Sequence, residues 1–176
     1  MQKKHYVQIN QWLRNHKTVH TLLDFFATRI VFLYVCIPFV LVWFVTGREY
    51  ITLAGVGLLV AWGIVVQLIG LVLPVRRPYQ AYGFVPSAGK GLFSHVDEQY
   101  DSFPSGHTTA LGVLTVAALW FSPALALVSL VITLCTAGAR VFLGYHYVQD
   151  VVAALVLSSA VMLVLQYSGF VHMVLL

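Results

Sequence analysis

The sequence predicts an all-α integral membrane protein with about five transmembrane helices and an N-terminal amphipathic helix at the membrane interface. Of its 176 residues, 60% are hydrophobic and 9% are charged, and the mean hydropathy is +0.86. A soluble domain of this length could not bury so much apolar surface. Long uncharged runs separated by polar segments indicate helices that cross a bilayer. The length fits one domain, residues 1–176.

Charge and cysteine content narrow the class of partner. The formal net charge of +4 suits an anionic lipid or a phosphorylated substrate. Nucleic acid is excluded as a partner, because binding it needs a dense basic stripe that the sequence lacks. Cys36 and Cys135 both lie in apolar runs. We interpret them as small buried hydrophobic residues rather than as a disulfide or a metal-binding pair.

The N-terminal segment, residues 1–25, is amphipathic. The apolar residues that recur at helical spacing within 5–24 are Tyr6, Ile9, Trp12 and Leu13. The segment is too polar to cross the bilayer, so we expect a helix at the membrane surface with Trp12 and Tyr6 at headgroup level. A frayed polar tail is the alternative.

Uncharged runs predict the spans themselves, since about 17–25 residues cross the hydrocarbon layer. The predicted spans are 30–46, 51–75, two helices within 108–139, and 151–171. Phe121-Ser122-Pro123 divides the two helices of 108–139, which we expect to form a tight hairpin. The polar connection at 79–104 is long, and loops of that length are usually functional.

Alternating crossings place the polar ends of different spans on one side of the membrane. Arg77 follows the second span, Ser105 and His107 begin the third, Arg140 ends the fourth, and His146 and Asp150 begin the fifth. We therefore expect one site, built from residues 76–150, at one face of the bilayer.

The residue types at this face favour binding of a phosphate. Arg77 and Arg140 come from different helices, and guanidinium groups keep their proton and match phosphate geometry. The stretch 104–107 predicts a helix start with its proline at the first helical position, where backbone N–H groups bind anions. Gly106 allows close approach of the backbone, and the Ser105 hydroxyl adds a donor. Together these features predict a phosphate cradle.

The histidines of the same face suggest how the phosphate would react. His146 and Asp150 are spaced i, i+4, so on a helix they would share a face, and a carboxylate there stabilises a nucleophilic imidazole. His107 can protonate the leaving oxygen. This set predicts a metal-free phosphomonoesterase or pyrophosphatase with no cofactor, since no cluster has metal-ligand spacing. A plainer interpretation stays open, in which Asp150 only caps the last helix.

Three motifs together resemble the signature of the type-2 phosphatidic acid phosphatase superfamily, which includes vanadium haloperoxidases and bacterial acid phosphatases. They are Arg77-Pro78, Pro104-Ser105-Gly106-His107, and Arg140-x5-His146-x3-Asp150, within about residues 70–150. The resemblance implies that His146 is a nucleophile forming a phosphohistidine, that Asp150 orients it, and that His107 is the acid. It implies phosphate ligands at Arg77, Ser105, Gly106 and Arg140.

The short chain, the amphipathic start and the segments 93–95 and 101–104 look most like bacterial undecaprenyl-diphosphatases. This likeness implies a bacterial inner-membrane enzyme that acts on carrier lipid pyrophosphate at the outer face. The basic residues before position 30 point to the opposite orientation under the positive-inside rule. A phosphatidylglycerophosphate or phosphatidic acid phosphatase, a lipid phosphotransferase and a non-catalytic headgroup-binding protein are the alternatives.

Two positions depart from the pattern of the superfamily that the motifs resemble. Gly70 stands where the first motif usually has a lysine, and Ala139 stands where the third motif usually has a serine. Arg76 or Lys90 could supply the missing positive charge, so Arg76 is a further candidate for binding phosphate. An altered substrate range or a weak enzyme would also fit these departures.

Overall fold

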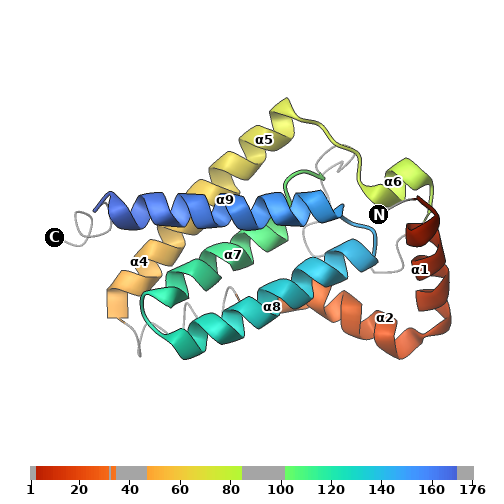
Figure 1. Cartoon of the computed structure of the whole chain (residues 1–176), viewed down its shortest axis with the longest axis horizontal. Helices are drawn as coiled ribbons and strands as arrows, with labels where there is room; N and C mark the ends of the chain where they lie inside the picture. Colours follow the sequence, from red (N-terminus) through yellow and green to blue (C-terminus); the bar gives the residue numbers. More distant parts are fainter. Residues whose placement is uncertain (1–2, 32, 35–46, 85–101, 170–176) are drawn as a thin grey trace.

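The computed structural model describes residues 3–31, 33–34, 47–84 and 102–169, and this part of the chain is built of helices without a strand (Figure 1). The N-terminal elements are α1 (Lys3–Asn15), α2 (Lys17–Asp24) and the π-helical segment η1 (Phe25–Arg29). A continuous helix follows, made of α4 (Gly47–Gly57), the π-helical η2 (Leu58–Val66) and α5 (Gln67–Val72). The remaining helices are α6 (Pro78–Tyr82), α7 (Gly106–Leu119), α8 (Pro123–Phe142) and α9 (Val148–Tyr167).

Three helices in the described part are long and apolar enough to cross a membrane: Glu49–Val72, Pro123–Phe142 and Val148–Tyr167. α7 is also apolar but has 14 residues. At 1.5 Å per residue it is about 21 Å long, short of the ~30 Å hydrocarbon layer. The protein is therefore an all-α, membrane-embedded protein. The predicted span 30–46 lies mostly outside the described residues, so the count of five stays a prediction.

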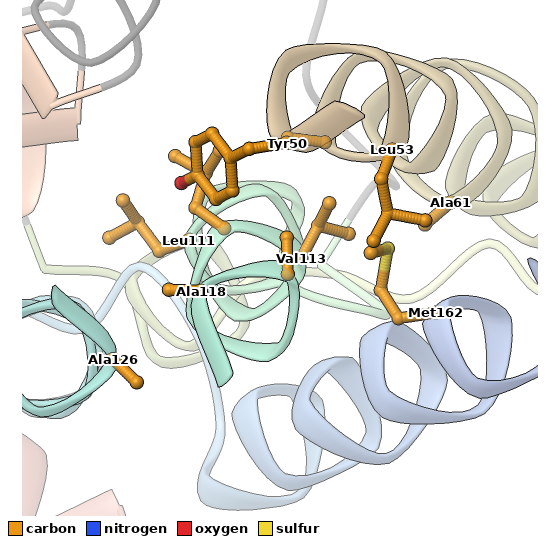
Figure 2. Close-up of a cluster of buried hydrophobic side chains, with 11 residues drawn as sticks. Tyr50, Leu53, Ala61, Leu111, Val113, Ala118, Ala126 and Met162 are labelled. Carbon is orange, nitrogen blue, oxygen red and sulfur yellow. The ribbon is translucent and has the colours of Figure 1, made fainter. Parts of the chain in front are cut away.

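α7 is the central helix and contacts α4, η2, α8 and α9. Figure 2 shows the main core cluster, to which α4 and η2 give Tyr50, Leu53 and Ala61, α7 gives Leu111, Val113 and Ala118, α8 gives Ala126 and α9 gives Met162. The hydroxyls of Thr115 and Thr133, 2.9 Å apart, join α7 to α8. Close packing and such polar contacts are what hold helices together in a bilayer, where lipid tails are as apolar as the helix surfaces.

Small residues let α9 approach its neighbours closely. A methyl group on Gly112 of α7 would overlap the side chain of Ser158 in α9. A methyl group on Gly57 of α4 would overlap the sulfur of Met162. The backbone of α7 is thereby fixed against α4 and α9, and the residues at its N-terminus are fixed with it.

Several boundaries differ from the sequence prediction. α8 continues to Phe142, three residues beyond the predicted end at 139, and Arg140 lies in its last turn. α9 begins at Val148, three residues earlier than predicted. Pro104 is not the first residue of α7, because the helix begins at Gly106. Cys135 is exposed rather than buried, since it lies on an outer face of α8, where lipid can cover an apolar residue.

The N-terminal segment is two helices and not one, because the chain leaves the helical conformation at His16. Tyr6 is fully buried against the protein, whereas Trp12 is half exposed. Tyr6 therefore packs against the protein and not against lipid, and the headgroup level of the two rings stays a prediction. Cys36, Lys90 and most of the predicted 79–104 loop lie outside the described residues.

Candidate active site

The predicted site residues come together where α7 begins, α8 ends and α9 begins. Nη2 of Arg140 is 3.2 Å from Nε2 of His146, and the backbone N–H of Ser105 donates to the carbonyl of Asp150 at 3.2 Å. The side chains that act electrostatically on His107 are Arg140, His146 and Arg77. The structure thus groups Arg77, Ser105, Gly106, His107, Arg140, His146 and Asp150.

His146 is buried, and its two ring nitrogens face different partners. Nδ1 lies 2.7 Å from the carbonyl oxygen of Ser102. A carbonyl can only accept, so we assign the ring proton to Nδ1. Nε2 then carries the lone pair and accepts from the guanidinium of Arg140. In this tautomer Nε2 is the atom that can attack phosphorus.

The environment of His146 keeps its ring neutral. Burial, with the cations of Arg140 and Arg77, holds the pKa of His146 well below its ordinary value, against a smaller opposing effect of the bond to Ser102. A neutral imidazole has the unprotonated nitrogen that nucleophilic attack requires. The same two arginines would attract an anionic phosphate to this lone pair.

Ser102 connects the segment before the first motif to His146 and Asp150 of the third, and the sequence analysis assigned it no role. Its backbone N–H donates to the carbonyl of Val75 at 3.0 Å, and its hydroxyl donates to Oδ2 of Asp150 at 2.6 Å. Its carbonyl accepts from His146. Ser102 is fully buried, so these bonds are shielded from water. The one available signal in the sequence was its position directly before the 103–107 stretch.

Asp150 lies in the first turn of α9 and is also a helix cap. Its Oδ2 accepts from the backbone N–H of Tyr147 at 2.8 Å and from Ser102, and it is 3.7 Å from Nδ1 of His146. The prediction that His146 and Asp150 share a helix face is wrong, because Tyr147 is the N-cap of α9 and His146 precedes it. The Asp150 carboxylate acts on the His146 imidazole in two ways: through Ser102, which bonds to both residues, and electrostatically over the 3.7 Å to Nδ1.

The N-terminus of α7 lies where the sequence predicts the backbone cradle for phosphate. Ser105 is the N-cap, and its carbonyl accepts from Thr109 N–H at 2.9 Å. The preceding N–H groups, from Gly106 to Thr108, are those that a helix cannot pair internally. The Ser105 hydroxyl is 3.0 Å from that of Thr108. This helix end, beside two arginines, is a favourable place for an anion.

The two arginines are buried and held by different elements. Arg77 is the extended N-cap of α6. Arg140 donates from Nη1 to the carbonyl of Ala27 in η1 at 3.3 Å, and its guanidinium lies 4.6 Å from the ring centre of Tyr145. Arg76 is exposed, and the cations that lower the pKa of His107 and His146 are Arg140 and Arg77.

Tyr6 brings α1 onto the loop that carries His146. Its hydroxyl donates to the backbone carbonyl of His146 at 3.4 Å. Its ring packs against Tyr82 and Tyr147, with centroids 5.7 Å and 6.2 Å away. Burial raises the pKa of Tyr6 to about 12, so the hydroxyl keeps its proton as a donor. Helical spacing in the sequence could not reveal a contact with a residue 140 positions away.

Within the described residues, no group of three or more histidine, cysteine or acidic side chains could hold a metal ion.

Comparison with known proteins places this geometry in a family. No curated protein matches the chain at a significant level. A family model described as the PAP2 superfamily matches residues 50–172, which include all seven grouped site residues. Since that match covers more than half of the 176 residues, the chain belongs to the PAP2 superfamily.

Proposed function

We propose that this protein is a lipid phosphate phosphatase that converts undecaprenyl diphosphate to undecaprenyl phosphate and phosphate through a phosphohistidine at His146. Membership of the PAP2 superfamily implies a phosphatase-type activity on phosphate esters. The apolar helices make a membrane lipid the fitting substrate. The observation that carries the proposal is the contact between Nε2 of His146 and the guanidinium of Arg140.

In the first step, the guanidinium of Arg140 turns from Nε2 of His146 to the phosphoryl oxygens, the freed Nε2 lone pair attacks phosphorus, and the bond to the leaving oxygen breaks. The imidazole gains positive charge, which the Ser102 carbonyl at Nδ1–H and the nearby Asp150 carboxylate stabilise. Arg77, Arg140 and the N–H groups at the start of α7 bind the phosphoryl oxygens, where negative charge accumulates. His107 gives a proton to the leaving oxygen. Burial and the cations of Arg140 and Arg77 hold the pKa of His107 well below its ordinary value, so we propose that it takes up this proton when the anionic phosphate binds beside it.

In the second step, water attacks the phosphohistidine. His107, now neutral, takes a proton from the water as its oxygen bonds to phosphorus. The N–P bond breaks, the electron pair returns to Nε2 of His146, and inorganic phosphate leaves. A lipid alcohol in place of water would give a phosphotransferase, which is the second candidate. Two cationic arginines provide the positive charge that this scheme needs, so we propose that it runs without a metal ion.

The preference for undecaprenyl diphosphate rests on the amphipathic start and on the residues before the second motif. Phosphatidic acid and phosphatidylglycerophosphate present the same terminal phosphate and are the alternative substrates. Gly70, in place of the usual lysine, motivates the remaining alternative of a protein that binds lipid headgroups without turnover. We propose an outer-face site in a bacterial inner membrane, because carrier lipid pyrophosphate is released there.

The test is phosphate release by the purified protein from undecaprenyl diphosphate, phosphatidylglycerophosphate and phosphatidic acid in EDTA. We expect turnover of all three with the highest kcat/KM for undecaprenyl diphosphate, and none with His146→Ala. Adding an acceptor lipid separates hydrolysis from transfer. Activity that chelator abolishes and added metal restores would contradict the metal-free scheme. Binding without phosphate release would support the non-catalytic alternative instead.

A further inference from the structure

We propose that Trp62 belongs to the substrate site and that its indole Nε1–H donates a hydrogen bond to a phosphoryl oxygen held at the start of α7. The inference rests on the proposed function of that site. It adds a contact from η2, an element that none of the three motifs includes.

The indole ring lies against the first residue of α7. A Cβ atom on Gly106 would be 3.0 Å from Nε1 of Trp62 and 3.3 Å from its Cδ1. The edge of the ring that carries the N–H group is therefore the edge that faces Gly106. Trp62 itself is 49% exposed, so a ligand can reach the ring.

In this arrangement the indole N–H group of Trp62 and the backbone N–H groups at the start of α7, all of them hydrogen-bond donors, lie close together. An indole N–H can only donate, and the first N–H groups of a helix are also unpaired donors. In the described part of the chain, Nε2 of Gln67 donates to the backbone carbonyl of Trp62 at 3.4 Å. That bond leaves the indole Nε1–H of Trp62 unused. An anion at the start of α7 would accept from both sets of donors.

The position of Trp62 along its span argues against an ordinary interfacial tryptophan. Tryptophan is enriched at the two ends of transmembrane helices, at headgroup level. Trp62 follows Glu49, the first residue of the 24-residue span, by 13 residues, about 20 Å along the helix axis. Away from the headgroups an indole N–H group that is left unpaired is costly, so a partner such as a bound phosphate would stabilise it.

The backbone around Trp62 is also unusual. The nine-residue segment η2 is π-helical within an otherwise α-helical span. π-helical turns inside α-helices are rare and are frequent at functional sites. The wider turn changes the direction of the side chains that follow its start, which is consistent with a ring aimed at α7.

Trp62→Phe keeps an aromatic ring and removes the N–H group, so it isolates the proposed bond. A hydrogen bond to a charged group predicts a loss of roughly ten-fold or more in kcat/KM for a lipid phosphate. We expect inhibition by orthovanadate, a phosphate analogue without a lipid tail, to weaken by a similar factor. The matched control is Trp12→Phe on α1, which is also 49% exposed and stacks on His16, and it should behave as wild type.

A spectroscopic reading separates this contact from a structural role. In protein labelled with ¹⁵N-tryptophan, the indole signal that Trp62→Phe removes should shift when orthovanadate is added. A signal that does not shift, with normal kinetics in Trp62→Phe, would refute the contact while the proposed phosphatase activity stood. A shifted signal in a wild-type protein without phosphatase activity would instead refute the proposed function and leave the contact standing.

Discussion

At the level of single residues, Ser102 links the nucleophile His146 to the carboxylate of Asp150. Its carbonyl fixes the His146 tautomer, while its hydroxyl occupies the oxygen of Asp150 that is nearest to the imidazole. A proton on Nδ1 and a lone pair on Nε2 are thus built into the folded site. The Asp150 carboxylate supports this arrangement through its hydrogen bond to Ser102. Replacing Ser102, His146 or Asp150 should therefore lower activity by different amounts.

Removal of the nucleophile should cost the most. We expect His146→Ala to lower turnover by on the order of 10⁴-fold or more, because the covalent route is lost. Asp150→Asn should be milder, since the Ser102 carbonyl still holds the ring. Initial rates of phosphate release, with gel filtration as the check of folding, measure both. Near-normal turnover by folded His146→Ala would rule out a phosphohistidine at this residue.

The low pKa of His146 predicts a pH profile. The neutral ring reacts, so lowering the pKa of His146 keeps kcat/KM high below pH ~6.5, the ordinary pKa of histidine. Arg140→Gln removes one of the cations that lower this pKa. The acidic limb of log kcat/KM should therefore move to higher pH, in addition to an overall loss of activity. Lys17→Gln, an exposed change on α2, should leave the limb in place. An unmoved limb in Arg140→Gln would show that another group controls it.

At the level of helices, the N-terminal elements hold residues of the site in place, which their amphipathic pattern does not indicate. η1 fixes Arg140 through the Ala27 carbonyl, and α1 contacts the His146 loop through Tyr6. Their sequence shows an apolar helix face but not what that face meets, because the partners lie more than a hundred residues away. The match to the PAP2 superfamily begins at residue 50, after these elements.

Tyr6→Phe tests whether α1 positions the nucleophile. The bond to the His146 carbonyl is long, so its loss should cost about 1 kcal/mol or less, roughly five-fold. We expect the loss in kcat with KM unchanged, since the carbonyl holds the catalytic loop and not the substrate. Tyr167→Phe, at the exposed end of α9, is the matched control. An equal fall in both variants would remove the positioning role.

Gly70 and Arg77 lie on different elements and not on one helix. α5 ends at Val72, and Arg77 is extended at the start of α6. A Cβ at Gly70 would meet nothing within 4 Å, so Gly70→Lys should fold. We expect its kcat/KM to stay near wild type, whereas Arg77→Ala should lose about 10- to 150-fold.

Arg76 remains the candidate that supplies the missing positive charge. Since it is exposed, water screens its interaction with phosphate, and Arg76→Ala should weaken phosphate binding less than Arg77→Ala does. Orthovanadate inhibition constants for the three variants measure this order. A large gain of activity in Gly70→Lys would show instead that the site lacks a cation.

For the whole molecule, the sequence predicts those features of the fold that depend on a single physical rule. Uncharged length predicts membrane helices, and alternation of crossings predicts that the polar ends meet, as they do for Arg77, Ser105, Arg140 and His146. Details that depend on contacts between distant residues were not accessible. The bond from Ser102 to Asp150, 48 residues away, is one of these. By contrast, the local bond from the Tyr147 N–H group to the Asp150 carboxylate, which takes His146 out of the helix, agrees with the interpretation of Asp150 as a helix cap.

The shortness of α7 has a consequence for how bilayer thickness controls the reaction. The edge-to-face contact of Tyr50 with Phe121, 5.4 Å apart, sets the far ends of α4 and α7 level. If that level is one edge of the hydrocarbon, α7 reaches about 21 Å across and the site lies ~9 Å beneath the opposite edge. A headgroup must sink by this distance, and local thinning of the membrane eases its descent at a fraction of a kcal/mol per Å. In vesicles of phosphatidylcholine with longer acyl chains, kcat/KM should therefore fall steadily for a lipid phosphate, and a rate independent of chain length would place the site at the surface.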